Sequence, residues 1–494
     1  MRLAPMLKPK ANELNVPAAP ASAPAAASVR IIPRSDHTVS RSGISPNALR
    51  VLYRLRDGGF QAFLVGGCVR DLLLGIEPKD FDVATDALPE QVRKLFRNCR
   101  LVGRRFRLAH VFFGQETIEV ATFRASTAPS QGEEPMPDAD PEEGEAPEMD
   151  EPMELQLAEV EDDAERVFDE TGRIIRDNVY GSIDEDVWRR DFTANSLYYN
   201  IADFSIWDYM GGAADIAART LRLIGDPETR YREDPVRMLR AARFEAKLGF
   251  GLDPATAAPL EKLRQLLGGV PPARLFDESL KLFLTGHGVR SLEVLRRRGL
   301  LSVLLPTIDA YFTTHPGSLV EKLVMQGLKN TDARVKENKP VTPTFLFAVL
   351  LYGPIAKEIE ATPPQHWHEL TTILDACDRA VREAQTHIAI PRRFALGVRE
   401  MFGLQPRLEH PRGRRALRLL EHPRFRAGYD LLLLRAQHGL ASREMADWWT
   451  KIQAASPEAR AQMADALGGS QPPREGARRG PRRRRRGRRP ANPA

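Results

Sequence analysis

Two aspartates one residue apart, Asp80 and Asp82, follow a glycine-rich turn in this chain. Side chains alternate along a strand, so a strand here would point both carboxylates to one face and Phe81 into the core. Two carboxylates on one face can hold two divalent cations roughly 3.5–4 Å apart, the arrangement used for in-line displacement at phosphorus. The spacing therefore predicts a metal site for phosphoryl or nucleotidyl transfer.

The turn itself contains Gly66 and Gly67. Glycines let backbone N–H groups approach an anion closely, and the residues that follow, 69–74, are typical of a helix start. A lone Gly-Gly or a lone Asp-x-Asp is common in surface turns and would favour a structural role. Their order and close spacing favour a phosphate cradle beside a metal site.

The elements that must position these residues can be read from the pattern of apolar residues and breakers. We expect helices at about 46–57 and 87–96, the latter with Pro89 in its first turn, and strands at 62–65, 80–83, 109–113, 117–123 and 174–176. From residue 213 almost to 467 the pattern is helical. The chain is therefore predicted to be α+β, with a small mixed α/β head followed by an all-helical region.

A third carboxylate, Glu119, lies on the strand expected beside the metal strand. Such a group can position a metal or activate a 3′-hydroxyl nucleophile. The alternative is an ordinary exposed glutamate, and only the context favours a catalytic role.

The run Arg189-Arg190-Asp191 offers two guanidinium groups and a carboxylate. Arginines such as Arg190 can clamp a triphosphate and neutralise the leaving pyrophosphate. Asp191 can complete the metal site, orient an arginine, or form a buried structural ion pair. Asn195 can hydrogen-bond a ribose hydroxyl or cap a helix.

A second paired signal begins at Asp234, which suits a helix N-cap, with Pro235 at the first helical position. Arg237 follows one turn on. Together the two side chains present an acceptor beside a donor, which matches the Watson–Crick edge of adenine or cytosine and not that of guanine or uracil. The alternative is an i,i+3 surface salt bridge worth ~0.2–0.5 kcal/mol.

These motifs together resemble the class II nucleotidyltransferases of the polymerase β superfamily, which include bacterial poly(A) polymerases and CCA-adding enzymes. The resemblance covers roughly residues 30–450. It is carried by residues 64–71, 80–82, 189–195 and 233–244, and the segments 103–111, 271–280 and 421–425 resemble the poly(A) polymerase branch.

The resemblance implies Mg²⁺-dependent addition of AMP from ATP to RNA 3′ ends, an activity that promotes RNA turnover. A CCA-adding tRNA nucleotidyltransferase is the alternative, and a noncatalytic RNA-binding protein would have no need for paired metal carboxylates. The resemblance assigns metal binding to Asp80 and Asp82, triphosphate and ribose contacts to Gly66, Gly67 and Arg70, and base recognition to Asp234 and Arg237.

Selection of ATP over CTP needs a rigid, purine-sized pocket, and the segment 103–111, Arg240 and Arg243 are the candidates for fixing its geometry. The domain order implied is a leader at 1–40, a head at 41–212, a neck at 213–285, a body and leg at 286–467 and a tail at 468–494.

Charge is strongly segregated, although the net charge of the 494 residues is only +6. Residues 129–166 are acidic with a single basic residue, and residues 474–489 are mostly arginine. Like-charge runs with little apolar surface are expected to be disordered. The arginine tail would add salt-dependent affinity for RNA phosphates, or else serve solubility or a protein partner.

Three widely separated cysteines form no CxxC pair and indicate a reducing compartment. No apolar run approaches the ~20 residues of a membrane span, and no secretory h-region follows the N-terminus. We therefore expect a cytoplasmic monomer without a membrane span that acts on RNA 3′ ends and has RNA-decay proteins as candidate partners.

Overall fold

The computed structural model describes residues 28–103, 107–125, 167–168, 174–176 and 179–467. Among these residues the chain forms two compact units, the first ending at Pro227 and the second beginning at Glu228. The acidic segment 129–166, the tail from 468 and most of the predicted leader lie outside the described residues. So do residues 104–106 of the segment that marks the poly(A) polymerase branch.

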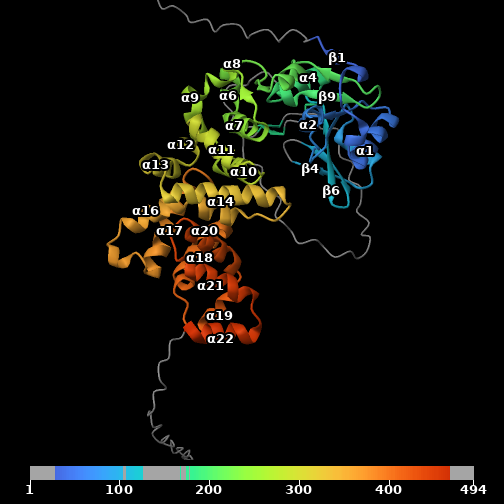
Figure 1. Ribbon diagram of the computed structural model, residues 1–494. Coiled ribbons are helices and arrows are strands. Elements are labelled where there is room, and N and C mark those ends of the chain that lie inside the picture. The colour runs from blue at the N-terminus through green and yellow to red at the C-terminus, as the bar shows by residue number, and fades with distance from the viewer. Residues whose placement is uncertain (1–27, 104–106, 126–166, 169–173, 177–178, 468–494) are drawn as a thin grey trace, which may run out of the picture. The chain divides into compact units, whose positions relative to one another are not determined.

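The first unit is built on one mixed sheet of eight strands in the order β1-β10-β9-β2-β3-β6-β5-β4 (Figure 1). β3 and β6 are parallel, and the other neighbours are antiparallel. The strands are β1 (Arg30–Ile32), β2 (Ala62–Val65), β3 (Asp82–Thr85), β4 (Cys99–Val102), β5 (Leu108–Phe113), β6 (Glu116–Thr122), β9 (Leu197–Asn200) and β10 (Ile206–Asp208).

Short helices and turns complete this unit. They are η1 (Arg34–Asp36), η2 (Arg41–Gly43), α1 (Pro46–Asp57), α2 (Gly67–Leu73), α3 (Pro89–Leu95), α4 (Ile183–Arg189), η3 (Thr193–Asn195) and α5 (Gly212–Ala217). β7 (Val167–Phe168) pairs with β8 (Ile174–Arg176), and β11 spans Thr220–Leu221. The predicted mixed α/β head is confirmed.

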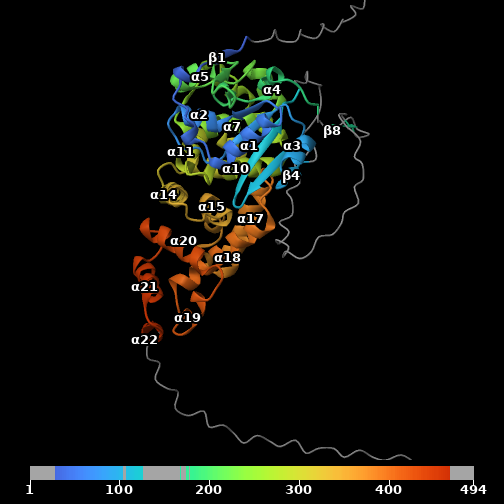
Figure 2. The ribbon, with the colours of Figure 1, turned by 90° about the vertical axis from the view of Figure 1, so that its right-hand side faces the viewer.

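Helices cover the two faces of the sheet differently. α1 begins where the Ser45 hydroxyl accepts the Ala48 N–H at 3.0 Å, and it packs against β2, β3 and β6. α3 packs beside β4, β5 and β6 (Figure 2). On the other face, the buried side chains of Phe63 and Val65 join Val187 of α4 in one core cluster.

The strand predicted at 80–83 begins two residues later, at Asp82. Asp82 is the partner of Val65, the last residue of β2, so the ladder with β2 ends there. Asp80 therefore precedes the strand, and alternation along a strand does not fix its direction. β4 was not predicted, because a four-residue edge strand with an exposed arginine carries little apolar pattern.

The second unit is helical apart from β12 (Gly251–Leu252), so the prediction of a helical C-terminal region is confirmed. Its helices and turns are α6 (Pro227–Glu233), α7 (Val236–Leu248), α8 (Pro254–Ala257), α9 (Leu260–Leu263), η4 (Arg264–Gly269), α10 (Pro272–Phe283), α11 (Gly288–Arg297), α12 (Leu301–Leu304), α13 (Pro306–Thr314), α14 (Leu319–Lys336), α15 (Pro343–Leu350), α16 (Tyr352–Glu360), η5 (Pro364–His366), α17 (Leu370–Gln385), α18 (Arg392–Glu409), α19 (Arg415–Leu420), α20 (Phe425–Gln437), α21 (Arg443–Ala454) and α22 (Pro457–Leu467). Within the described ranges, none of the helices combines the length and apolar character needed to cross a membrane.

The start of α7 differs by one residue from the prediction. Pro235 is the N-cap and Val236 the first helical residue. Asp234 still caps this end, because its Oδ1 accepts the Val236 N–H at 3.2 Å.

Gly212, the first residue of α5, lets α5 pack directly on η3. A Cβ at this position would lie 2.2 Å from the backbone oxygen of Thr193. We predict that Gly212→Ala lowers the free energy of unfolding by about 1–3 kcal/mol, the usual range for overpacking. Urea unfolding measures this loss. Ala214→Ser, at an exposed position of the same helix, is the control, and an equal effect of both variants would contradict the packing argument.

Candidate active site

The glycine turn after β2 has a backbone conformation that only glycine adopts readily. Gly66 has φ 76° and ψ −137° and is the N-cap of α2. A Cβ built on Gly66 would lie 3.6 Å from Arg190 Nη1 and 3.8 Å from Asp82 Oδ2. The turn thus brings the backbone between a guanidinium and a carboxylate.

Asp82 lies at the first position of β3, in register with Val65 on one side and Glu119 on the other. Its side chain remains accessible to a ligand. The pKa of Asp82 is raised from 3.8 to about 6, first by burial and then by the charges of Glu119 and Asp80, while Arg190 opposes the rise. Two carboxylates therefore lie close enough to Asp82 to repel its charge, with one arginine as the counter-charge.

Arg190 is held by partners from α4 and β9. Its Nε donates to the Tyr198 hydroxyl at 2.8 Å, and its Nη2 donates to Asp186 Oδ2 at 3.2 Å. The Tyr198 hydroxyl donates to the same carboxylate at 2.7 Å. Arg190 Nη1 also donates to the backbone oxygen of Asn195 at 3.4 Å. The guanidinium is therefore fixed beside Gly66 and Asp82, whereas Arg189 donates to the Ala125 carbonyl at 3.2 Å.

Arg70 and Asn195 form a second, buried network under the turn. Arg70 is 2% exposed, and its Nε and Nη2 donate to Asp71 Oδ1 at 2.8 and 2.6 Å. Its Nη1 donates to the side-chain oxygen of Asn195. The Asn195 amide donates to Asp191 Oδ1 at 3.3 Å, and that oxygen also accepts the Phe192 N–H at 2.7 Å. Asp191 thus orients Asn195 and, through it, Arg70.

The candidate base-reading residues lie in the second unit, and each is held by another partner. Arg237 donates from Nη1 to the Arg230 carbonyl at 2.8 Å and to Glu233 Oε2 at 3.1 Å. Asp234 accepts from Arg274 Nη2 at 2.8 Å. Burial lowers the pKa of Arg237, with nearby Arg230 adding to the effect.

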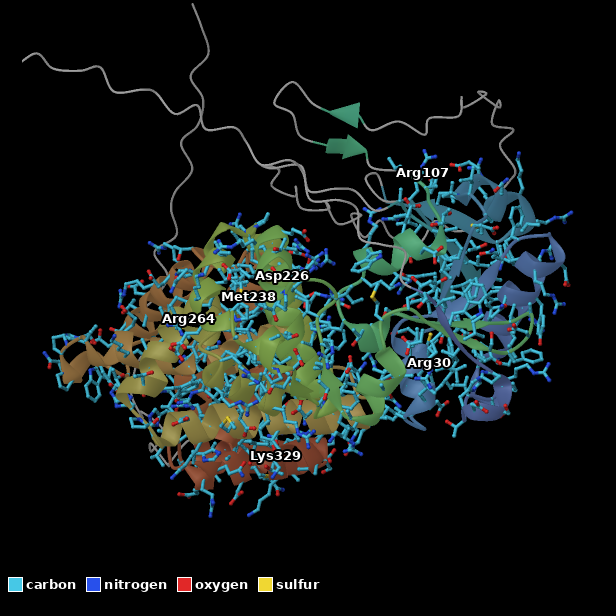
Figure 3. All side chains as sticks on the ribbon, turned by 90° about the horizontal axis from the view of Figure 1, so that it is seen from above. Arg30, Arg107, Asp226, Met238, Arg264 and Lys329 are labelled. Carbon is cyan, nitrogen blue, oxygen red and sulfur yellow. The ribbon has the colours of Figure 1, made fainter. Side chains whose placement is uncertain are left out.

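Two further arginines of α7 converge on one buried glutamate of α10. Arg243 Nε donates to Glu278 Oε2 at 3.2 Å, and Arg240 Nη1 lies 3.9 Å from Glu278 Oε1. Lys281 Nζ donates to Glu278 Oε1 at 3.3 Å. The Glu278 side chain is 5% exposed, so it ties α7 to α10 from the interior. Met238 marks α7 in Figure 3.

The structure thus forms two groups of candidate residues, each within its own unit. The first unit contains Asp80, Asp82, Glu119, Gly66, Gly67, Arg70, Arg190, Asp191 and Asn195. The second contains Asp234, Arg237, Arg240 and Arg243.

Sequence reasoning missed the residues that hold the arginines: Asp71, Asp186, Tyr198, Arg274 and Glu278. Two of these had a local signal, since Asp71 adjoins Arg70 and Asp186 precedes Arg190 by one helical turn. Tyr198 lies across the sheet, and Arg274 and Glu278 come from another helix, so no short motif includes them.

The residues around Asp82 fit a divalent cation. Burial and the like charges of Glu119 and Asp80 raise the proton affinity of Asp82, and a bound cation would relieve the repulsion by those two charges. Among the described residues, no group of three or more His, Cys, Asp or Glu side chains is arranged so that it could hold a metal ion by itself. Mg²⁺ is usually bound by one or two carboxylates together with substrate phosphates. The pair Asp80 and Asp82 meets that requirement.

Comparison with known proteins identifies the family of the chain. Residues 62–222 match the poly A polymerase head domain, residues 249–312 a probable RNA- and SrmB-binding site of polymerase A, and residues 365–490 the polymerase A arginine-rich C-terminus. Poly(A) polymerase I of Salmonella typhi is 46% identical over 449 residues, covering 90% of each chain.

More distant relatives are CCA-adding enzymes. That of Bacillus velezensis is 33% identical over 264 residues, which are 53% of this chain and 56% of the relative. A tRNA nucleotidyltransferase solved with a primer tRNA and an incoming ATP analog shares the fold, with a TM-score of 0.51 and 20% identity over 82% of this chain and 98% of the other.

The mixed sheet with the helical second unit, together with the match to the poly A polymerase head domain and the poly(A) polymerase relatives, shows that the chain is a nucleotidyltransferase. The chain belongs to the bacterial poly(A) polymerase I family, whose activity is the addition of poly(A).

The raised pKa of Asp82 has a testable consequence for stability. Between about pH 4 and 6 the folded chain retains a proton on Asp82 that the unfolded chain has released, so this group lowers stability as pH rises through that window. We predict that Asp82→Asn, in chelator near pH 7.5, raises the free energy of unfolding by on the order of 1 kcal/mol after allowing for solvent screening.

Urea unfolding at several pH values measures this difference, which should vanish below about pH 4, where the wild-type carboxyl is also neutral. Asp57→Asn, at a side chain 65% exposed, is the control. An Asp82→Asn variant that is no more stable than the wild type near neutral pH would contradict the electrostatic argument.

Proposed function

We propose that the chain extends RNA 3′ ends with AMP from ATP through attack of the RNA 3′-hydroxyl on the α-phosphate, with pyrophosphate leaving. The observation that carries this proposal is the accessible Asp82 carboxylate beside Asp80 and Glu119, with Gly66 and Arg190 against it. Family membership supports poly(A) addition over CCA addition, because the relatives that match 90% of the chain are poly(A) polymerases.

Asp80 and Asp82 would hold two Mg²⁺ ions, which when bound neutralise charge on the α-phosphate and on the leaving pyrophosphate. Glu119, in register with Asp82, is suited to orient the 3′-hydroxyl or accept its proton. Arg190 supplies a fixed positive charge for the triphosphate, and the backbone at Gly66 and Gly67 can approach the phosphates closely.

The buried residues of the turn have a supporting role in this proposal. Arg70 is enclosed by Asp71 and Asn195, so its main contribution is to set the position of the glycine turn on which the triphosphate and ribose rest. Asp191 acts through Asn195 in the same network.

Adenine selection would come from Asp234 and Arg237, whose acceptor and donor groups match the Watson–Crick edge of adenine. Both side chains already have partners, so they are restrained before the nucleotide binds. Arg240 and Arg243 restrain α7 itself through Glu278. Restraint of this kind favours the one base that fits without readjustment.

Further features belong to the same proposal. The neck at 213–285 and the body and leg at 286–467 remain a proposed division. The three cysteines are free and buried, which is compatible with a cytoplasmic enzyme. A monomeric state and an association with RNA-decay proteins also remain predictions.

The first test removes the proposed metal carboxylate. Asp82→Ala should lower the single-turnover rate of AMP incorporation by ~10³-fold or more, because metal stabilisation of the α-phosphate is worth several kcal/mol. Asp57→Ala, at an exposed position of α1, should match the wild type. Near wild-type incorporation by a folded Asp82→Ala variant would refute the mechanism.

The second test concerns the nucleotide. Arg237→Ala should reduce the kcat/KM preference for ATP over CTP, GTP and UTP more than it weakens triphosphate affinity. Glu278→Gln should reduce the ATP-over-CTP preference as well, since a loosened α7 misplaces the base, and a misplacement of ~1 Å can cost on the order of 10²-fold.

Single-turnover incorporation of each nucleotide into an oligo(A) primer measures both effects. Lys281→Ala, which removes only the exposed partner of Glu278, is the control. Efficient CTP addition that stops after two residues would show that the enzyme is CCA-adding instead.

A further inference from the structure

The sheet of the first unit has an open, chemically mixed face next to Asp82. On β4, β5 and β6 the buried side chains Cys99, Val111 and Val120 lie on the face that packs against α3. The alternate positions carry Arg100, His110, Phe112, Thr117 and Glu119. Arg100, Thr117 and Glu119 are exposed, and His110 and Phe112 are partly exposed.

These alternate residues form a row that runs directly from the catalytic carboxylate. The cross-strand register is Asp82, Glu119, His110 and Arg100, on β3, β6, β5 and β4 in turn. Asp82 and Arg100, at the two ends of the row, are three strand spacings apart. At ~4.8 Å for each spacing, this is a distance of about 14 Å across the sheet. The row therefore begins at the reaction centre and ends at the edge strand of the sheet. In Figure 3, Arg107 marks the β4–β5 end of the sheet and Arg30 marks the opposite edge strand.

Side-chain contacts confirm that the row lies on one face. His110 Nε2 is 3.8 Å from Glu119 Oε1. The Arg100 guanidinium carbon lies 5.9 Å from the centre of the Phe112 ring, and the His110 ring meets Phe112 edge-on at 6.3 Å. The charge along the row changes from negative at Asp82 and Glu119 to positive at Arg100.

We propose that this face is the track for the single-stranded 3′ end of the RNA acceptor. The terminal ribose would lie at Glu119 and Asp82, a base near the 3′ end would stack on Phe112, and Arg100 would bind a backbone phosphate. An aromatic side chain beside a cation is the combination that binds single-stranded nucleic acid without sequence preference. His110 lies between the two ends of the row, beside Glu119 and against the edge of Phe112.

The charge gradient gives the strand its direction. A 3′-hydroxyl belongs at the carboxylate end, where the metal and Glu119 can reach it, and the preceding phosphates belong at the arginine end. The opposite polarity would place phosphates against Glu119. This inference rests on the proposed adenylyl transfer, since it assigns the acceptor site of that reaction.

The test compares variants of the full chain with a short oligo(A) primer in single-turnover AMP addition. Phe112→Leu should raise the KM for the primer by about tenfold or more, because stacking on an aromatic ring is lost, while the KM for ATP stays unchanged. Phe112→Trp should retain primer binding. Arg100→Ala should also raise the primer KM. The slope of log KM for the primer against log salt concentration should fall by about one, because one phosphate contact is lost.

The matched control is Arg97→Ala, an exposed arginine in the turn before β4.

A primer carrying 4-thiouridine at its 3′ terminus should crosslink to β5 or β6 of the wild type. Thermal unfolding verifies that each variant folds, and Arg100→Ala carries the test if Phe112→Leu does not fold, because Arg100 is exposed.

Primer KM values for Phe112→Leu and Arg100→Ala equal to that of Arg97→Ala would overturn the proposal, as would equal losses in Phe112→Leu and Phe112→Trp. A wild-type chain that adds no AMP at all would instead refute the proposed function, so the two failures are distinguishable.

Discussion

The burial of the Asp82 carboxylate beside the like charges of Glu119 and Asp80 is the constraint on which the proposed site depends. The parallel pairing of β3 with β6 puts Asp82 and Glu119 in register, and Asp80 lies two residues before the strand. Such a cluster is costly in a folded protein unless a cation binds to it. The raised pKa of Asp82 therefore lowers the stability of the head at neutral pH, and a cation bound at the proposed site would offset that loss.

The arginines near these carboxylates are held in fixed positions by hydrogen bonds to buried or partly buried side chains. Arg190 is fixed by Tyr198 and Asp186, and Arg70 by Asp71 and Asn195. In the second unit, Glu278 restrains the arginines of α7 in the same way. Groups fixed before the substrate binds need no reorganisation when charge develops in the reaction, which is the main source of electrostatic catalysis. In the proposed mechanism, the long-range partners of these arginines would therefore contribute to catalysis by holding the charges in place.

The difference between local and long-range contacts explains how much of the fold and the candidate site could be predicted from the sequence. The strand at Ala62–Val65 and the helix at Pro46–Asp57 were predicted with their observed bounds, because a short run of apolar residues and a Ser-Pro start encode them. The metal strand began later than predicted, since its first residue is set by where β2 ends, which is a nonlocal property. Likewise, nothing near Asp234 in the sequence indicates that Arg274, 40 residues away, is its partner.

Metal binding to the full chain tests the central claim most directly. Titration with Mn²⁺ in the presence of ATP, followed calorimetrically, should show tight binding near pH 7.5 that weakens as pH falls through about 6, because the proton on Asp82 competes with the cation. Asp82→Asn should lose most of this binding and its pH dependence, while Asp57→Asn should keep both. Equal Mn²⁺ affinity in the wild type and Asp82→Asn at every pH would show that the repelling carboxylates are not the metal site.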